Sequence, residues 1–229
     1  MGTPLPGCVS LTPLVLTLTL TLLLALRLDH MVEACSCNPA HPQQHFCSAE
    51  IVIRGKISGE KVVSPSNSTS PYLKMIQYEI KLIKMLKGFE KVKDIQYVYT
   101  PVFSSLCGVK LDSNNKVHYL LSGSMWSDGK VSIGLCDLVE PWDNLSMSQK
   151  KNLNYRYQMG CDCKIATCYS VPCATTTDNE CLWTDWLLVN SLSGEQARQY
   201  ACIKSSDSSC SWYRSGPPPE NDFMDMSDP

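Results

Sequence analysis

Val32-Glu33-Ala34-Cys35-Ser36-Cys37 is the stretch that decides where the folded part of this 229-residue chain begins. An apolar segment without acidic residues, rich in leucine and threonine, precedes it over residues 11–28. Val32-Glu33-Ala34 is a small-residue motif of the kind that signal peptidase cleaves. Cleavage after Ala34 would remove a signal peptide, residues 1–34, and leave Cys35 with a free α-amine. An amine and a carbonyl on one rigidly held residue form a candidate bidentate metal ligand.

A membrane anchor is the alternative for residues 11–28, because about 20 apolar residues can cross a bilayer. Threonines interrupt this segment, however, and no lysine or arginine precedes it. The small-residue motif and the cysteine-rich chain beyond it favour a signal peptide. We therefore expect a secreted, extracellular protein.

Twelve cysteines follow the expected cleavage point, and an even number in an oxidising compartment predicts six disulfides. The spacing does not determine their pairing. Zinc binding by Cys161-x-Cys163 and Cys168-x₄-Cys173 is the alternative, but secretion argues against free thiolates. The cysteines are Cys35, Cys37, Cys47, Cys107, Cys136, Cys161, Cys163, Cys168, Cys173, Cys181, Cys202 and Cys210.

Charge divides the chain into two parts of opposite sign. Residues 35–160 contain 15 lysines and arginines against 10 acidic residues, whereas residues 161–229 contain 4 against 10. This asymmetry predicts two modules that face different partners. The end of the chain, 220–229, is acidic and free of cysteine, and we expect it to be extended and mobile.

The first part has the texture of β-structure. Apolar and polar residues alternate over 76–82, and the β-branched content favours a strand over a helix there. Five strands in about 90 residues suit a small closed barrel, for which the OB-fold is one option. A mobile hairpin loop is predicted over 58–71. The expected strands are 50–57, 76–82, 95–100, 117–121 and 130–135.

Helices are predicted at 42–49 and at 146–154, where Ser146 precedes Gln149 as a capping pair. In the second part the apolar content is low, so its core needs disulfides as staples. We expect its tryptophans to pack against these disulfides. They are Trp183, Trp186 and Trp212.

The residues expected to remain after cleavage contain no H-E-x-x-H, G-x-S-x-G or phosphate-binding glycine loop, so we expect no enzyme. His41 and His45 could form a metal pair, but surface histidines on a first helix are the favoured interpretation. Tyr97 and Tyr99 on a mildly basic barrel could bind nucleic acid. Secretion argues against that partner.

Several longer motifs resemble the tissue inhibitors of metalloproteinases, and the similarity covers all twelve cysteines. The acidic tail looks most like that of the second paralogue of this family. The motifs are Cys35-Ser-Cys-Asn-Pro-Ala-His-Pro-Gln-Gln-His-Phe-Cys47, Ile76-Gln-Tyr-Glu-Ile80, Leu135-Cys-Asp137, Tyr155-Arg-Tyr-Gln-Met-Gly-Cys-Asp-Cys163 and Glu180-Cys-Leu-Trp183.

The resemblance implies a mainly β protein with flanking helices. Residues 35–160 would form a five-stranded, netrin-like OB-fold barrel, residues 161–219 a small disulfide-rich domain, and residues 220–229 a flexible tail. The implied disulfides are Cys35–Cys107, Cys37–Cys136, Cys47–Cys161, Cys163–Cys210, Cys168–Cys173 and Cys181–Cys202.

The resemblance also implies a mechanism, inhibition of matrix metalloproteinases. The α-amine and carbonyl of Cys35 would chelate the catalytic zinc of the target protease, and the chain would need no cofactor of its own. Ser36 would enter the specificity pocket. Cys37, Asn38 and Pro39 would lie on the primed side of the cleft. The unprimed side would meet Ser104, Ser105, Leu106, Cys107 and Gly108.

A second implied partner is the hemopexin-like domain of progelatinase A, met by the disulfide-rich domain and the tail. The extracellular matrix or a cell-surface protease is a further candidate partner, and we expect a monomer. Two sequons, at Asn67 and Asn144, are candidate N-glycosylation sites. A secreted netrin-like module that binds a receptor or matrix without inhibiting proteases is the alternative function. The tail residues expected to bind are Glu220, Asp222, Phe223, Asp225 and Asp228.

The first hairpin loop departs from the family pattern. Long-looped relatives carry a tyrosine near the loop tip that contacts membrane-type proteases, whereas this tip is Pro65-Ser-Asn-Ser-Thr69, with Tyr72 lying later. The resemblance therefore does not carry that contact over to this chain.

Overall fold

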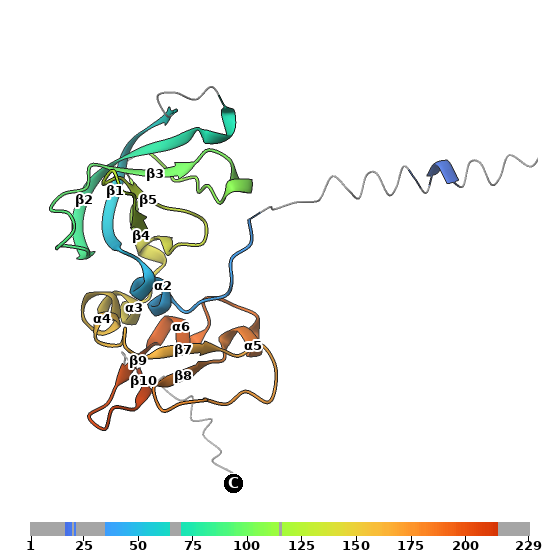
Figure 1. The fold of residues 1–229 in the computed structure, drawn as a ribbon, viewed down its shortest axis with the longest axis vertical. Coiled ribbons are helices and arrows are strands. Elements are labelled where there is room, and N and C mark those ends of the chain that lie inside the picture. The colour runs from blue at the N-terminus through green and yellow to red at the C-terminus, as the bar shows by residue number, and fades with distance from the viewer. Residues whose placement is uncertain (1–16, 20, 22–34, 65–69, 115, 215–229) are drawn as a thin grey trace, which may run out of the picture. The chain divides into compact units, whose positions relative to one another are not determined.

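The computed structural model describes residues 17–19, 21, 35–64, 70–114 and 116–214 (Figure 1). The chain divides after Ala34, and the elements below all belong to the unit that begins at Cys35. Among the described residues, no helix combines the length and apolar character needed to cross a membrane.

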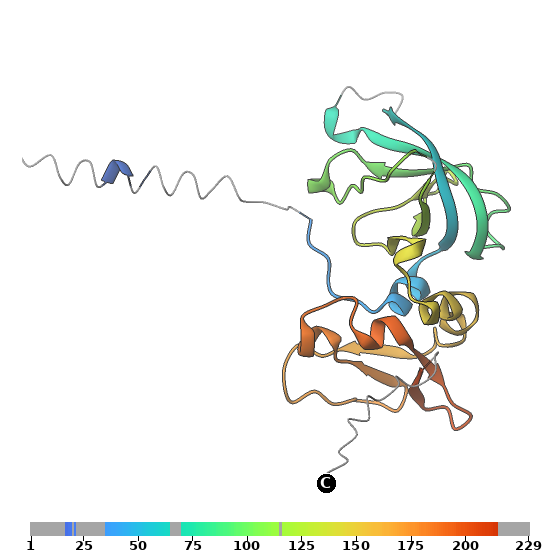
Figure 2. The ribbon, with the colours of Figure 1, turned by 180° about the vertical axis from the view of Figure 1, so that it is seen from behind.

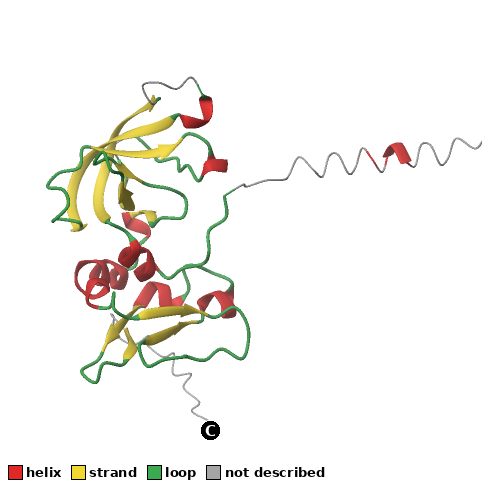
Figure 3. Cartoon of the chain, in the orientation of Figure 1, coloured by secondary structure: helices red, strands yellow, loops and turns green. Residues whose placement is uncertain are grey.

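Six strands form the main sheet, in the order β1-β2-β3-β5-β4-β6 (Figure 3). Because β1 also pairs with β4, the first five strands close into a ring. Within this ring β3 and β5 are parallel and the other pairs antiparallel. The mainly β prediction is confirmed, although β6 was not expected. The strands are β1 (Ile51–Val63), β2 (Met75–Lys87), β3 (Tyr97–Pro101), β4 (His118–Met125), β5 (Val131–Ser132) and β6 (Val139–Pro141).

Alternation along β1 and β2 builds the core inside this ring. Ile53 and Ile57 of β1 are buried together with Tyr78 and Ile80 of β2, whereas Lys81 is exposed. Side chains of a strand alternate between its two faces, so every second residue reaches the core. The strand predicted over 76–82 is therefore correct.

The loop predicted over 58–71 is too long. β1 continues to Val63, which pairs with Met75, and Pro71–Leu73 forms a 3₁₀ turn, η1. Backbone pairing with β2 satisfies the polar backbone of 58–63, and this outweighs the weak strand propensity of its polar side chains. The tip, 65–69, lies outside the described residues.

Two helical segments cover the outer face of the ring. α2 (Pro42–Ser48) begins with a capping box between His41 and Gln44. The second segment runs through α3 (Met147–Lys151), the π-helical turn η4 (Asn152–Arg156) and α4 (Tyr157–Met159). Ser146 caps α3 as predicted. Phe46, Leu153 and Tyr157 join Val52 and Leu120 in a second buried cluster.

Residues 164–214, the last described stretch, form two small two-stranded sheets and two short helices, seen from behind in Figure 2. Their buried cluster contains Trp183, Cys181 and Cys202, with Trp212 packed against it. These two tryptophans pack against disulfides as predicted, whereas Trp186 is not among the residues of this cluster. The elements are β7 (Lys164–Thr167), β8 (Glu180–Trp183), α5 (Asp185–Val189), α6 (Glu195–Gln199), β9 (Tyr200–Lys204) and β10 (Cys210–Arg214).

Helix α2 connects the ring to these later elements. The Gln43 amide donates to the carbonyl oxygens of Gly160 (3.0 Å) and Cys202 (2.7 Å) and accepts from the Cys202 amide (2.8 Å). These three bonds use both amide hydrogens and the carbonyl oxygen of the buried Gln43 side chain. Truncating this side chain would therefore leave backbone groups of Gly160 and Cys202 unpaired. The segment that begins at Cys35 is therefore anchored to both parts of the fold.

Candidate functional site

Six disulfides join cysteines within the described part of the chain, and their pairs coincide with those that the resemblance implies. Their Cα–Cα distances lie between 5.2 and 6.1 Å, within the range that disulfides require. The alternative zinc site is wrong, because Cys161, Cys163, Cys168 and Cys173 are all bonded to other cysteines.

Two of these disulfides fix the segment that begins at Cys35. Cys35 is tied to Cys107, and Cys37 is tied to Cys136. The sulfur atoms of Cys35 and Cys136 lie 4.0 Å apart, so the two bridges are neighbours. Ser36, between them, is exposed, while Cys35 itself is buried. The bridges therefore clamp three chain segments into one edge and leave the residue between them open to a partner.

The second segment of this edge is a tight turn. Ser104–Leu106 form the 3₁₀ turn η2, and Cys107 adopts a left-handed conformation with φ of 61°. The amide of Gly108 donates to the carbonyl of Phe103 (3.0 Å). A Cβ at Gly108 would clash with the carbonyl oxygens of Pro101 and Phe103, so only glycine fits there. The sequence thus fixes the path of the 104–108 loop.

The third segment is a turn from Gly134 to Asp137, of which the sequence and the resemblance marked only Cys136 for the site, as the partner of Cys37. The Asp137 amide donates to the Gly134 carbonyl (3.1 Å), and the Gly134 amide donates to Asp137 Oδ2 (2.7 Å). Leu135 donates its amide to the Cys107 carbonyl (2.8 Å) and so joins the turn to the 104–108 loop. Burial raises the pKa of the Asp137 carboxyl. The motif Leu135-Cys136-Asp137 was the available signal.

Apolar side chains flank the clamped edge. The exposed fractions are 39% for Phe103, 44% for Leu106 and 45% for Leu135. The ring of Tyr72, on η1, lies 5.8 Å from that of Phe103. Exposed apolar side chains grouped around a rigid backbone are typical of a protein-binding surface.

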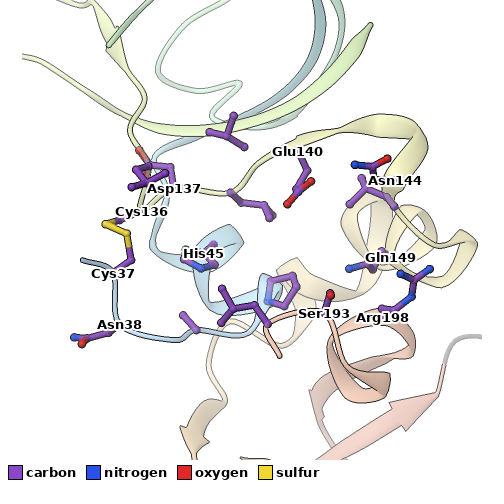
Figure 4. A pocket seen from close by; sticks show the side chains of 17 residues that line it. Cys37, Asn38, His45, Cys136, Asp137, Glu140, Asn144, Gln149, Ser193 and Arg198 are labelled. Atoms are coloured by element: carbon purple, nitrogen blue, oxygen red, sulfur yellow. A yellow bond between two sulfur atoms is a disulfide. The ribbon is translucent and has the colours of Figure 1, made fainter. Parts of the chain in front are cut away.

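A cavity of about 670 Å³ lies behind this edge, and its lining residues come from three separate stretches of the chain (Figure 4). Cys37 and Asn38 form one side, Asp137 and Glu140 another, and Arg198 comes from α6. The sequence offered no signal for this cavity, because its walls are far apart along the chain.

The prediction that His41 lies on the surface is wrong. His41 is fully buried, with its ring near those of Trp183 and Trp212. Nδ1 accepts from the Gln43 amide (3.2 Å), and Nε2 lies 3.2 Å from the Gln196 carbonyl. Burial lowers its pKa to about 4, so the ring is neutral at pH 7. With both ring nitrogens occupied, His41 cannot pair with His45 as a metal ligand.

The other expected site residues are placed as follows. Asn144 is exposed at the end of the 3₁₀ turn η3 (Trp142–Asn144) and lines the cavity. Pro39 is half-buried and Asn38 exposed. Several expected residues lie outside the described part of the chain: Asn67, Glu220, Asp222, Phe223, Asp225 and Asp228.

Residues 33–212 match a family model described as tissue inhibitor of metalloproteinase. The chain belongs to the tissue inhibitor of metalloproteinase family. It is 57% identical over 197 residues to metalloproteinase inhibitor 4 of Mus musculus, covering 86% of this chain and 88% of the relative. It is 51% identical over 216 residues to metalloproteinase inhibitor 2 of Homo sapiens, covering 93% and 97%.

Metalloproteinase inhibitor 2 of Gallus gallus is 49% identical over 208 residues, which cover 90% of this chain and 94% of the relative. The likeness to the second paralogue is therefore shared with inhibitor 4, for which the identity is higher than for these two inhibitor 2 sequences. As members of the tissue inhibitor of metalloproteinase family, these relatives are inhibitors by name and not enzymes, in agreement with the expectation from the sequence.

Proposed function

We propose that this protein inhibits zinc-dependent matrix metalloproteinases by binding the catalytic zinc of the protease through Cys35. The observation that carries the proposal is the double clamp. Disulfides to Cys107 and Cys136 hold Cys35 and Cys37 on either side of an exposed Ser36. A ligand that is already rigid loses little conformational entropy when it binds, so its affinity is high.

The chemistry depends on removal of residues 1–34. Before cleavage the nitrogen of Cys35 is a peptide amide, which is a poor metal ligand. After cleavage it is an α-amine with an ordinary pKa of about 7.7–8.0, so deprotonation costs little near neutral pH. The amine and the carbonyl oxygen can then take the open position of a catalytic zinc and displace the water that would attack the substrate.

The flanking residues would supply the protein contacts. Ser36 would enter the specificity pocket, and its small side chain would fill that pocket only partly, which permits several target proteases. Cys37, Asn38 and Pro39 would follow the primed side of the cleft. The 104–108 loop would lie along the unprimed side, and its exposed Leu106 supports this assignment.

We further propose an OB-fold for the ring of strands, with a division into an inhibitory domain, 35–160, and a disulfide-rich domain, 161–219. A closed five-stranded ring with one parallel pair supports the OB assignment. Residues 1–34 would be the secretory signal, which agrees with the division of the chain after Ala34. The secreted protein would act as a monomer in a 1:1 complex.

Binding to the hemopexin-like domain of progelatinase A is a separate proposal that concerns the disulfide-rich domain and the tail. The acidic residues of 220–229 would attract a basic surface at long range, and Phe223 would anchor the tail. Charges of this kind mainly raise the association rate. The test is deletion of 220–229, which should slow association most at low salt; an unchanged rate would count against it.

The main experiment changes the N-terminus alone. The cleaved protein is prepared with one alanine placed before Cys35 and titrated against the catalytic domain of a matrix metalloproteinase. We expect inhibition to fall by at least about 1,000-fold, because the nitrogen becomes an amide again and the zinc ligand is lost. The matched control carries Ser36→Ala, which keeps the amine and should retain most of the inhibition.

Full inhibition by the extended protein would overturn zinc binding by Cys35. The favoured function would then be the alternative, a netrin-like module that binds a receptor or matrix.

A further inference from the structure

The turn from Gly134 to Asp137 is closed by a side chain. The Asp137 carboxylate accepts from the Gly134 amide at 2.7 Å, while the Asp137 amide donates back to the Gly134 carbonyl at 3.1 Å. These two bonds cross the same four residues in opposite directions. A hydrogen bond to an ionised acceptor is about twice as strong as a neutral one, so the carboxylate holds the turn firmly.

This turn carries both clamps of the N-terminal edge. Cys136, inside the turn, is bonded to Cys37. Leu135, also inside it, donates its amide to the carbonyl of Cys107, the residue bonded to Cys35. A shift of this turn would therefore move both ends of the Cys35–Cys37 segment.

The unfavourable burial of the Asp137 carboxylate indicates that this side chain has a role in the edge. Asp137 is half-buried at the wall of the cavity beside the Cys37–Cys136 bridge (Figure 4), and burying a carboxylate is unfavourable unless it is hydrogen-bonded. The residues of the turn belong to none of the buried clusters found among the described residues, and Leu135 and Cys136 are exposed. A carboxylate placed there supports a surface edge rather than a core.

We infer that Asp137 is a positioning residue for the inhibitory edge. Its carboxylate fixes the 134–137 turn, and the turn holds Cys136 and Cys107 so that the Cys35–Cys37 segment keeps the geometry that binds zinc. This inference rests on the proposed function. It assigns Asp137 no contact with the protease.

The test compares three variants of the cleaved protein, Asp137→Ala, Asp137→Asn and Glu140→Ala. Asparagine keeps an acceptor oxygen at the same position, whereas alanine removes it. Glu140 is exposed and lines the same cavity, so Glu140→Ala removes a nearby negative charge without touching the turn. Each variant is measured for its inhibition constant against a metalloproteinase catalytic domain, its melting temperature and its six intact disulfides by mass.

We expect Asp137→Ala to raise the inhibition constant about 10- to 100-fold, the loss expected for one charge-assisted hydrogen bond. Asp137→Asn should lose less, about 3- to 10-fold, because its neutral oxygen still accepts but makes a bond about half as strong, and Glu140→Ala should be unchanged. The melting temperature of Asp137→Ala should fall by only a few degrees. Rescue by asparagine separates loss of the acceptor from loss of charge.

An unchanged inhibition constant for Asp137→Ala would overturn the inference. So would an equal loss in Asp137→Asn, because that would assign the effect to charge. If Asp137→Ala does not fold, Asp137→Ser replaces it, since serine also removes the carboxylate.

The alanine extension before Cys35 distinguishes a failure of the positioning role of Asp137 from a failure of zinc binding by Cys35. If the extension abolishes inhibition while Asp137→Ala does not weaken it, only the positioning role fails. If the extended protein still inhibits, the zinc-binding function itself fails, whatever the Asp137 variants do.

Discussion

The ring of strands and the later disulfide-rich part are stabilised by different kinds of interaction. Inside the ring, Ile53, Ile57, Tyr78 and Leu121 belong to one extended buried cluster. In the later part the buried cluster is small, and two of its members, Cys181 and Cys202, are bonded to each other. The ring is thus held mainly by apolar burial, and the later part mainly by covalent links.

The later part also contains a buried polar network. The Asp185 carboxylate accepts from Trp183 Nε1 (3.0 Å) and from the amides of Gln196 (3.1 Å) and Ala197 (2.8 Å). Such a network stabilises only when every group is paired. Small domains lack the apolar area for a large core, which is why disulfides and polar networks replace it.

The largest expected effect comes from removing a staple. The double change Cys181→Ser with Cys202→Ser should destabilise the later part by roughly 4 kcal/mol, because the bridge restricts its unfolded chain and fills its core. Hydrogen exchange should show this part opening while the ring stays protected. Inhibition of a catalytic domain should survive if the Cys35–Cys107 and Cys37–Cys136 bridges hold the edge by themselves, and its loss would show that the anchoring of α2 at Cys202 is also needed.

A core deletion in the ring should cost somewhat less. Leu121→Ala leaves a cavity at a residue that is 1% exposed, for which we expect a loss of about 3 kcal/mol in urea unfolding. The control is Leu106→Ala, at an exposed position, which should cost well under 1 kcal/mol. Equal losses would contradict a ring held by its core.

Acid should weaken the junction at His41. Its folded pKa is about 4 and its unfolded value about 6.5, so between these pH values the unfolded chain binds more protons. Stability should therefore fall as the pH drops from about 6.5 to 4, by roughly 3 kcal/mol, and little further below that range. Asp185, which raises this pKa, and His45, which lowers it, are the charged neighbours.

The measurement is the melting temperature as a function of pH, compared with His41→Asn. Asparagine can still cap α2 but does not titrate, so part of the acid dependence should disappear. An identical pH profile in the variant would rule out His41 as its source.

The smallest effect should have the opposite sign. Lys56 and Lys81 lie directly opposite each other on β1 and β2, and like charges in that position repel. Lys81→Gln should raise stability by about 0.5 kcal/mol at low salt and by less at high salt. The exposed Lys93→Gln serves as control, and a loss of stability in Lys81→Gln would contradict the repulsion.

Local patterns predicted the elements well where one principle acted alone. Alternation over 76–82 indicated β2, and Ser146 with Gln149 indicated the start of α3. Predictions failed where long-range pairing decided the outcome. Strand β1 extends to Val63 because β2 pairs with it, and β6 exists because three residues meet the edge of β4.

The candidate site divides in the same way. Cys35, Cys107 and Gly108 could be named from the sequence, since their motifs and the resemblance marked them. Asp137 and the cavity could not, because their roles arise only when 35–39, 104–108 and 134–137 are brought together. His41 was misjudged for the same reason, since the rings that bury it lie more than a hundred residues away.

The sequence by itself determined the cysteine content, the two-residue period of the strands, the helix caps and the motif that would expose Cys35. These features depend on residues close together in the chain, where spacing and propensity act directly. The tertiary structure alone decided how the clamped edge is built. Its bridges join residues 72 and 99 positions apart, and its supporting turn is held by one carboxylate. Contacts across such separations depend on the whole fold, and no local pattern records them.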